Sequence, residues 1–104
     1  MNRFTAILLC AALLSVSTAK ERRLRQEFDD LAARASALVE VVDQTEANLR
    51  RQGQTLHPDI AAARNSLVAA MDRASSALER HDWTELRRSL DRARGWIDRL
   101  RRQL

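Results

Sequence analysis

The chain has 104 residues, of which 18 are Lys or Arg and 14 are Asp or Glu, so its formal net charge at pH 7 is +4. A chain of this length has room for one small domain. Its single cysteine excludes an internal disulfide framework and a multi-thiolate metal site. Because carboxylates are interspersed with the arginines, the positive charge gives only a slight preference for anionic partners.

The first 19 residues have the layout of a secretory signal peptide. Arg3 provides a basic start, an apolar run of 13 residues extends from Phe4 to Val16, and small residues lead up to Ala19. The burst of charge that follows begins at Lys20. We therefore predict cleavage after Ala19 and a periplasmic or secreted mature protein that starts near Lys20.

Two alternatives for the N-terminus stay open. An uncleaved N-terminal anchor would need about 20 apolar residues to span a bilayer, and the run is shorter than that. A lipoprotein would be acylated at Cys10, where the preceding Leu9 is larger than the residue such a site favours. The mature chain of residues 20–104 is predicted to have no transmembrane span, and it contains no cysteine.

Apolar residues recur every three or four positions through the rest of the chain, which is typical of amphipathic helices and not of strands. The pattern predicts an all-α fold with helices at about 22–52, 58–80 and 83–104. Phe28, Trp83 and the leucines are expected to contribute most of the core. The predicted seam residues are Leu24, Phe28, Leu31, Ala35, Leu38, Val42, Thr45, Leu49, Ile60, Ala63, Leu67, Met71, Ala74, Leu78, His81, Trp83, Leu86, Leu90, Ala93, Ile97, Leu100 and Leu104.

The predicted helix ends carry suitable residues. Gly53 is expected to end the first helix, and Pro58 suits the first turn of the second. Asp82 followed by Glu85 resembles a capping box that opens the third helix. Because the connections are short, we predict a small antiparallel three-helix bundle (up-down-up) with heptad-type seams, in which the longer first helix overhangs near its N-terminus.

One face of the third helix is the candidate interaction face. Several arginines of this helix are predicted to pair locally, as in Arg87–Asp91, Arg94–Asp98 and Asp98–Arg102. Four further residues of this helix take no part in these pairs and are spaced four, four and three apart. One of them, Trp96, is within reach of Arg92 and Arg99 for cation–π contact. This arginine face consists of Arg88, Arg92, Trp96 and Arg99.

No metal, cofactor or catalytic site is predicted. His57 and His81 are 24 residues apart, or roughly 36 Å along a helix, so one subunit cannot place both on one metal. His57-Pro58-Asp59 resembles the tripeptide of J-domain co-chaperones, which stimulates a cytoplasmic chaperone ATPase. The resemblance is confined to three residues, and an exported chain would not meet that partner. We interpret the match as coincidental.

A second resemblance concerns the first helix. Leu24-Arg25 and the run from Phe28 to Leu31, followed by Leu38-Val39, look like the first helix of small all-helical chorismate mutases, some of which are secreted. The resemblance implies a secreted enzyme whose substrate carboxylates are held by a lysine and an Arg-Glu pair. Here no lysine follows Lys20, and the third helix has no Arg-Glu dipeptide, so the active site of that family is not reproduced.

The sequence therefore predicts a small exported, non-enzymatic helical protein that acts as an adaptor, scaffold or protein-interaction module. The expected partner is an unidentified protein, or a second copy of the chain in a weak dimer. The first alternative is a binder of polyanions or anionic membrane surfaces that uses the arginine face, although nucleic acid is not the expected ligand. The second alternative is the chorismate-mutase-like enzyme.

Overall fold

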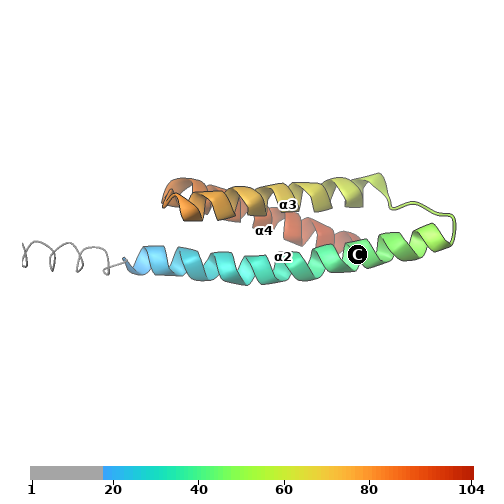
Figure 1. Ribbon diagram of the computed structural model, residues 1–104, viewed down its shortest axis with the longest axis horizontal. Coiled ribbons are helices and arrows are strands. Elements are labelled where there is room, and N and C mark those ends of the chain that lie inside the picture. The colour runs from blue at the N-terminus through green and yellow to red at the C-terminus, as the bar shows by residue number, and fades with distance from the viewer. Residues whose placement is uncertain (1–17) are drawn as a thin grey trace, which may run out of the picture.

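The computed structural model describes residues 18–104, so residues 1–17 of the predicted signal peptide lie outside the described part of the chain. Residues 18–104 form three helices, α2 (Ala19–Arg51), α3 (Pro58–Glu79) and α4 (Trp83–Gln103), and contain no strand. Figure 1 shows that α2 and α4 run in one direction and α3 in the other. The predicted all-α fold of three packed helices is confirmed, and each helix end lies within three residues of its predicted position.

Side-chain and backbone caps define both ends of α2. At its start, the Thr18 hydroxyl accepts a hydrogen bond of 3.2 Å from the backbone N–H of Glu21. At its end, Gly53 adopts the left-handed conformation with φ +72°. The N–H of Gln54 donates to the carbonyl of Leu49 at 2.8 Å, which completes a Schellman motif. Gly53 therefore ends the helix as its sequence position predicts.

The corner between α3 and α4 uses the same motif without a glycine. His81 takes the left-handed position with φ 55°, and the N–H of Asp82 donates to the carbonyl of Ala77 at 2.9 Å. Asp82 then caps α4 by accepting a hydrogen bond of 3.1 Å from the N–H of Glu85. The assignment of His81 to the apolar seam is wrong, because the helix has already ended there and the residue is exposed.

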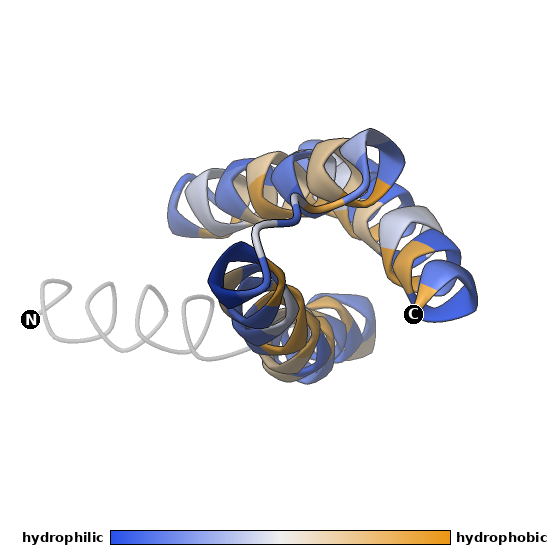
Figure 2. Cartoon of the chain, turned by 90° about the vertical axis from the view of Figure 1, so that its right-hand side faces the viewer, coloured by the Kyte–Doolittle hydropathy of each residue, from blue (hydrophilic) through white to orange (hydrophobic). Residues whose placement is uncertain are grey.

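The core is a single aliphatic cluster that receives residues from all three helices. Figure 2 shows the apolar sides of the helices facing one another. Most predicted seam positions are buried or half-buried, whereas Leu104 is 49% exposed beyond the end of α4. The buried apolar residues are Leu24, Leu31, Ala35, Val42, Ala63, Leu67, Ala70, Ala74, Ala77, Leu86, Leu90, Ala93, Ile97 and Leu100. Within the described residues 18–104, the cluster extends from Leu24 to Leu100.

The backbones of α3 and α4 approach each other more closely than those of any other pair of helices. Small side chains explain this closeness, because the distance between packed helices depends on the side chains between them. Four of the five buried residues of α3 are alanines. On α4 the small residues Ser89 and Ala93 are also buried. The Ser89 hydroxyl donates to the Glu85 carboxylate at 3.3 Å, so its burial leaves no unpaired polar atom.

The two largest predicted core residues lie at the edge of the cluster. Leucines contribute much of the core as expected, whereas Phe28 and Trp83 are only half-buried and contribute less than predicted. The Trp83 ring instead has the Arg25 guanidinium 5.5 Å from its centre, and the His81 ring meets it edge-on at 5.6 Å. The overhang of the first helix also differs from the prediction, since Figure 1 shows α2 extending past the α3–α4 hairpin at both ends and not only near its N-terminus.

Candidate interaction surfaces

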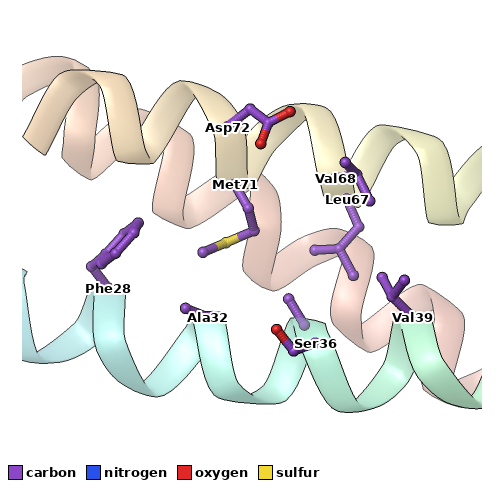
Figure 3. Close-up of a pocket in the computed structure, with 9 residues that line it drawn as sticks. Phe28, Ala32, Ser36, Val39, Leu67, Val68, Met71 and Asp72 are labelled. Atoms are coloured by element: carbon purple, nitrogen blue, oxygen red, sulfur yellow. The ribbon is translucent and has the colours of Figure 1, made fainter.

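An apolar groove lies between α2 and α3. It has a volume of about 260 Å³, and Figure 3 shows Phe28 of α2 and Met71 of α3 approaching each other across it. Val39 and Val68 line it farther along the two helices, and Asp72 stands on its α3 side. The complete lining is Phe28, Ala32, Ala35, Ser36, Val39, Leu67, Val68, Met71 and Asp72. The groove is therefore an extension of the core that opens to solvent.

The groove exists because α2 and α3 are the least closely packed pair of helices. The larger side chains of Phe28 and Met71 are only half-buried between them. Small residues on α2, namely Ala32 and Ser36, leave the space in front of them unfilled. Val68 lines the groove without belonging to the core cluster.

Acidic residues edge the groove. Asp72 is its only charged lining residue, and an adjoining hollow on α2 is lined by Glu40 and Asp43. The Arg64 guanidinium donates two hydrogen bonds to the carboxylate of Asp43, at 2.9 and 3.1 Å. These bonds lower the pKa of Asp43 and raise the pKa of Arg64. The bidentate pair fastens α3 to α2 beside the groove.

A second ion-pair cluster fastens α4 to α2 on another side of the bundle. Arg87 donates to both carboxylate oxygens of Glu27, at 2.8 and 3.1 Å, and Arg94 reaches the same carboxylate at 3.4 Å. The hydrogen bonds from Arg87 are the main cause of the lowered pKa of Glu27. Asp91 lies 3.5 Å from Arg87, as predicted. These residues form an intramolecular clamp.

Two of the predicted local pairs have other partners. Arg94 pairs with Glu27 on α2 instead of Asp98, since the neighbouring helix offers a carboxylate already held by Arg87. Arg102 donates from Nε to the backbone carbonyl of Asp98 at 3.3 Å, not to its carboxylate. Sequence spacing along α4 gives no information about Glu27, which lies on another helix.

The predicted arginine face lies on the side of α4 away from Glu27. Arg88 pairs with Glu85 at 3.4 Å, and the Arg99 guanidinium lies 5.2 Å from the centre of the Trp96 ring. The predicted cation–π contact between Arg92 and Trp96 is not formed. Arg92 is exposed and has no carboxylate within 4 Å among residues 18–104. Two of the three arginines are therefore engaged within α4, and Arg92 has no ion-pair partner in the described part of the chain.

Trp96 and Arg99 also border a hollow of about 380 Å³ against the first turns of α3. Asp59, Ala62 and Gln103 line it as well. The half-buried tryptophan thus packs at the seam between α3 and α4 and does not stand free in solvent. A carboxylate on one side and a guanidinium on the other give this hollow no single charge preference.

Both histidines serve as helix-end residues. The Nδ1 atom of His57 accepts a hydrogen bond of 3.1 Å from the N–H of Asp59, and Pro58 occupies the first helical position. The tripeptide His57-Pro58-Asp59 therefore forms the start of α3. Over the described part of the chain, no three His, Cys, Asp or Glu side chains gather as a metal site would require.

Within residues 18–104, none of the helices combines the length and the apolarity that a membrane crossing demands. No protein-family model, no curated protein and no solved structure matches this chain.

Proposed function

We propose that this protein is an exported, non-enzymatic adaptor that binds a helix of another protein in the groove between α2 and α3. The single observation that supports the proposal is the apolar groove itself, edged by Asp72 and open to solvent. Apolar surface arranged in this way is typical of protein-interaction sites.

The shape of the groove favours a helical partner. Its lining on α2 runs from Phe28 to Val39, which is roughly 16 Å of helix, or about three turns. Helix-in-groove binding uses apolar anchors spaced three or four residues apart over a comparable length. A partner helix laid between α2 and α3 would complete a four-helix arrangement, the usual way to bury such a seam.

The composition of the groove does not favour the chorismate-mutase-like alternative. A site for a substrate with two carboxylates needs basic groups that face it. The only charged residue that lines this groove is Asp72, which would repel such a substrate.

The polyanion-binding alternative depends on the arginine face. Arg88 and Arg99 are already engaged by Glu85 and Trp96, which leaves Arg92 as the one exposed arginine of the face without a partner among the described residues. A single free guanidinium contributes little to phosphate binding, which depends on several contacts made together. The groove is therefore preferred over the arginine face as the functional surface.

The proposal is tested by affinity capture from native cell envelope with two matched variants. Val68→Lys places a charge in the groove at a residue outside the core cluster. Val41→Lys places the same charge at a residue that is 46% exposed and lines neither the groove nor the adjoining hollow on α2. We expect a captured protein that is lost with Val68→Lys and retained with Val41→Lys. Equal capture by both variants would overturn the groove as the binding surface.

Export is tested separately by mass spectrometry of native protein. Cleavage after Ala19 would give a mature chain that starts at Lys20, and it would remove the Thr18 cap from the first turn of α2. The mature helix should therefore fray at its first turn, which circular dichroism of residues 18–104 and 20–104 would detect. Native protein that retains Met1 in the cytosol would contradict export.

A further inference from the structure

The charges around the groove indicate the chemistry of its occupant. We propose that the partner helix carries basic side chains on both flanks of its apolar ridge, and that the acidic edges of the groove on α2 and α3 select them. This inference depends on the proposed function, since it assumes that the groove binds a helix.

Two of the three carboxylates beside the groove have no ion pair with a basic side chain of the described residues. Asp72 on the α3 edge and Glu40 on the α2 edge have no basic group within 4 Å among the described residues. Asp43 is the exception, because Arg64 holds it in a bidentate pair. At the groove, each of the two helices thus carries a carboxylate without an ion pair among the described residues, and a helix lying between them would present both of its flanks to negative charge.

A second copy of this chain does not provide a partner helix with basic side chains on both flanks of an apolar ridge. If two grooves faced each other, Asp72 and Glu40 of one copy would approach the same residues of the other, and like charges across an interface are unfavourable. The arginine face of α4 carries basic residues, but its only apolar member is Trp96, which already packs at the seam with α3. Docking that face into a groove would also be a head-to-tail contact, which does not close a dimer.

The test uses two synthetic helical peptides of about three heptads with the same leucine ridge. One peptide has lysine at the flanking positions and the other has glutamate. Each is titrated into the full chain and into residues 18–104, the described part of the chain that forms the three packed helices. The readout is the methyl NMR signal of Met71 in the groove, which is easily assigned because the chain has only two methionines.

We expect the lysine peptide to shift the Met71 signal and to bind about tenfold more tightly than the glutamate peptide, with a preference that shrinks as salt is added. Asp72→Lys should reduce or reverse the preference. Val68→Lys should weaken both peptides by about tenfold or more, since a charge then enters the apolar contact. Val41→Lys, the matched control, should change neither affinity by more than about twofold.

The remaining outcomes separate this inference from the proposed function. Tighter binding of the glutamate peptide at Met71 would overturn the charge inference and leave the groove as a helix site. Failure of both peptides to shift Met71, or binding unaffected by Val68→Lys, would overturn the proposed function. Binding to residues 18–104 but not to the full chain would assign the groove to the N-terminal segment. A dimer that Val68→Lys abolishes would assign it to a second copy.

Discussion

The α3–α4 hairpin and the attachment of α2 solve the same packing problem in different ways. Alanines on α3 allow α4 to approach closely, and a corner of only a few residues joins the two helices. By contrast, α2 is connected by the longer segment 52–57, and beside its four buried core residues it packs through larger side chains, such as Phe28 and Leu38, that are only half-buried. Two ion-pair clusters, centred on Glu27 and Asp43, hold it in place.

This difference in packing explains why the groove lies between α2 and α3. Small residues at a helix interface leave little space once the backbones meet, and the hollow that borders both α3 and α4 lies at the open end of the hairpin, beside Trp96. Larger residues hold α2 at a distance from α3, and the space between them becomes the groove. The least closely packed interface of the bundle is thus the one at which we place the partner.

The largest expected effect compares the same truncation in the two regions. Leu90 of α4 is completely buried, so Leu90→Ala should lower the free energy of unfolding by about 2–5 kcal/mol. Leu38 of α2 is half-buried, so Leu38→Ala should cost only about 1–2 kcal/mol. Urea unfolding followed by circular dichroism measures both. Equal losses would show that α2 is as tightly packed as the hairpin.

The next effect compares an enlargement in each region. Ala74 of α3 is 0% exposed, so Ala74→Leu should force the helices apart and cost about 1–3 kcal/mol. Ala35 of α2 borders the groove, where the added methyl groups have room, so Ala35→Leu should change stability by less than about 1 kcal/mol. Thermal unfolding of the two variants tests this. A large loss in Ala35→Leu would mean that the groove is already filled.

The ion pairs that hold α2 predict how stability depends on pH. Hydrogen bonds from arginine lower the pKa of Glu27 and of Asp43 below their ordinary values of 4.5 and 3.8. Such groups stabilise the folded chain above those values, and the contribution is lost as the pH falls through the folded-state pKa. Because both carboxylates are partly exposed, each contributes about 1 kcal/mol or less.

The measurement is urea unfolding between neutral pH and pH values below the ordinary pKa of Asp43. The double variant Glu27→Gln with Asp43→Asn keeps the side-chain sizes and removes the titration, so its stability should fall less steeply with acidification. Parallel pH curves for the double variant and the unchanged chain would show that these pairs contribute nothing to the attachment of α2.

Periodicity along each helix was sufficient to predict the three helices and most of the seam, and single residues indicated the helix ends at Gly53, Pro58 and Asp82 but not the caps Thr18 and His57. It did not predict which seam residues would be enclosed, since Phe28 and Trp83 have the right spacing but lie at the edges. Ser89 is buried although its polarity suggests exposure, because the contact with α3 requires a small side chain. Burial of this kind depends on the neighbouring helix, which a pattern read along one helix does not describe.

The groove illustrates the same limit for the candidate site. Val39 and Val68 are apolar residues next to the seam, and that signal was available in the sequence. Their meeting across the α2–α3 interface depends on how far apart those helices are held. The spacing of its residues in the sequence predicted the arginine face. The pairing of Arg88 with Glu85 and the stacking of Arg99 on Trp96 depend on side-chain geometry, which the spacing does not describe.

The smallest effects compare the turns that bound the two regions. Gly53 and His81 occupy the same left-handed position of a Schellman motif, and only the glycine adopts it without strain. Gly53→Ala should therefore cost about 1 kcal/mol.

At the hairpin corner the strain is offset by the edge-on contact of the His81 ring with Trp83, an interaction of about 0.5–1.5 kcal/mol. His81→Gly removes the strain and the contact together, so stability should change by less than about 0.5 kcal/mol, whereas His81→Ala removes only the contact and should be the less stable of the two. Because both variants lack the ring, thermal unfolding that ranked His81→Ala above His81→Gly would show that the left-handed backbone at this corner is not strained.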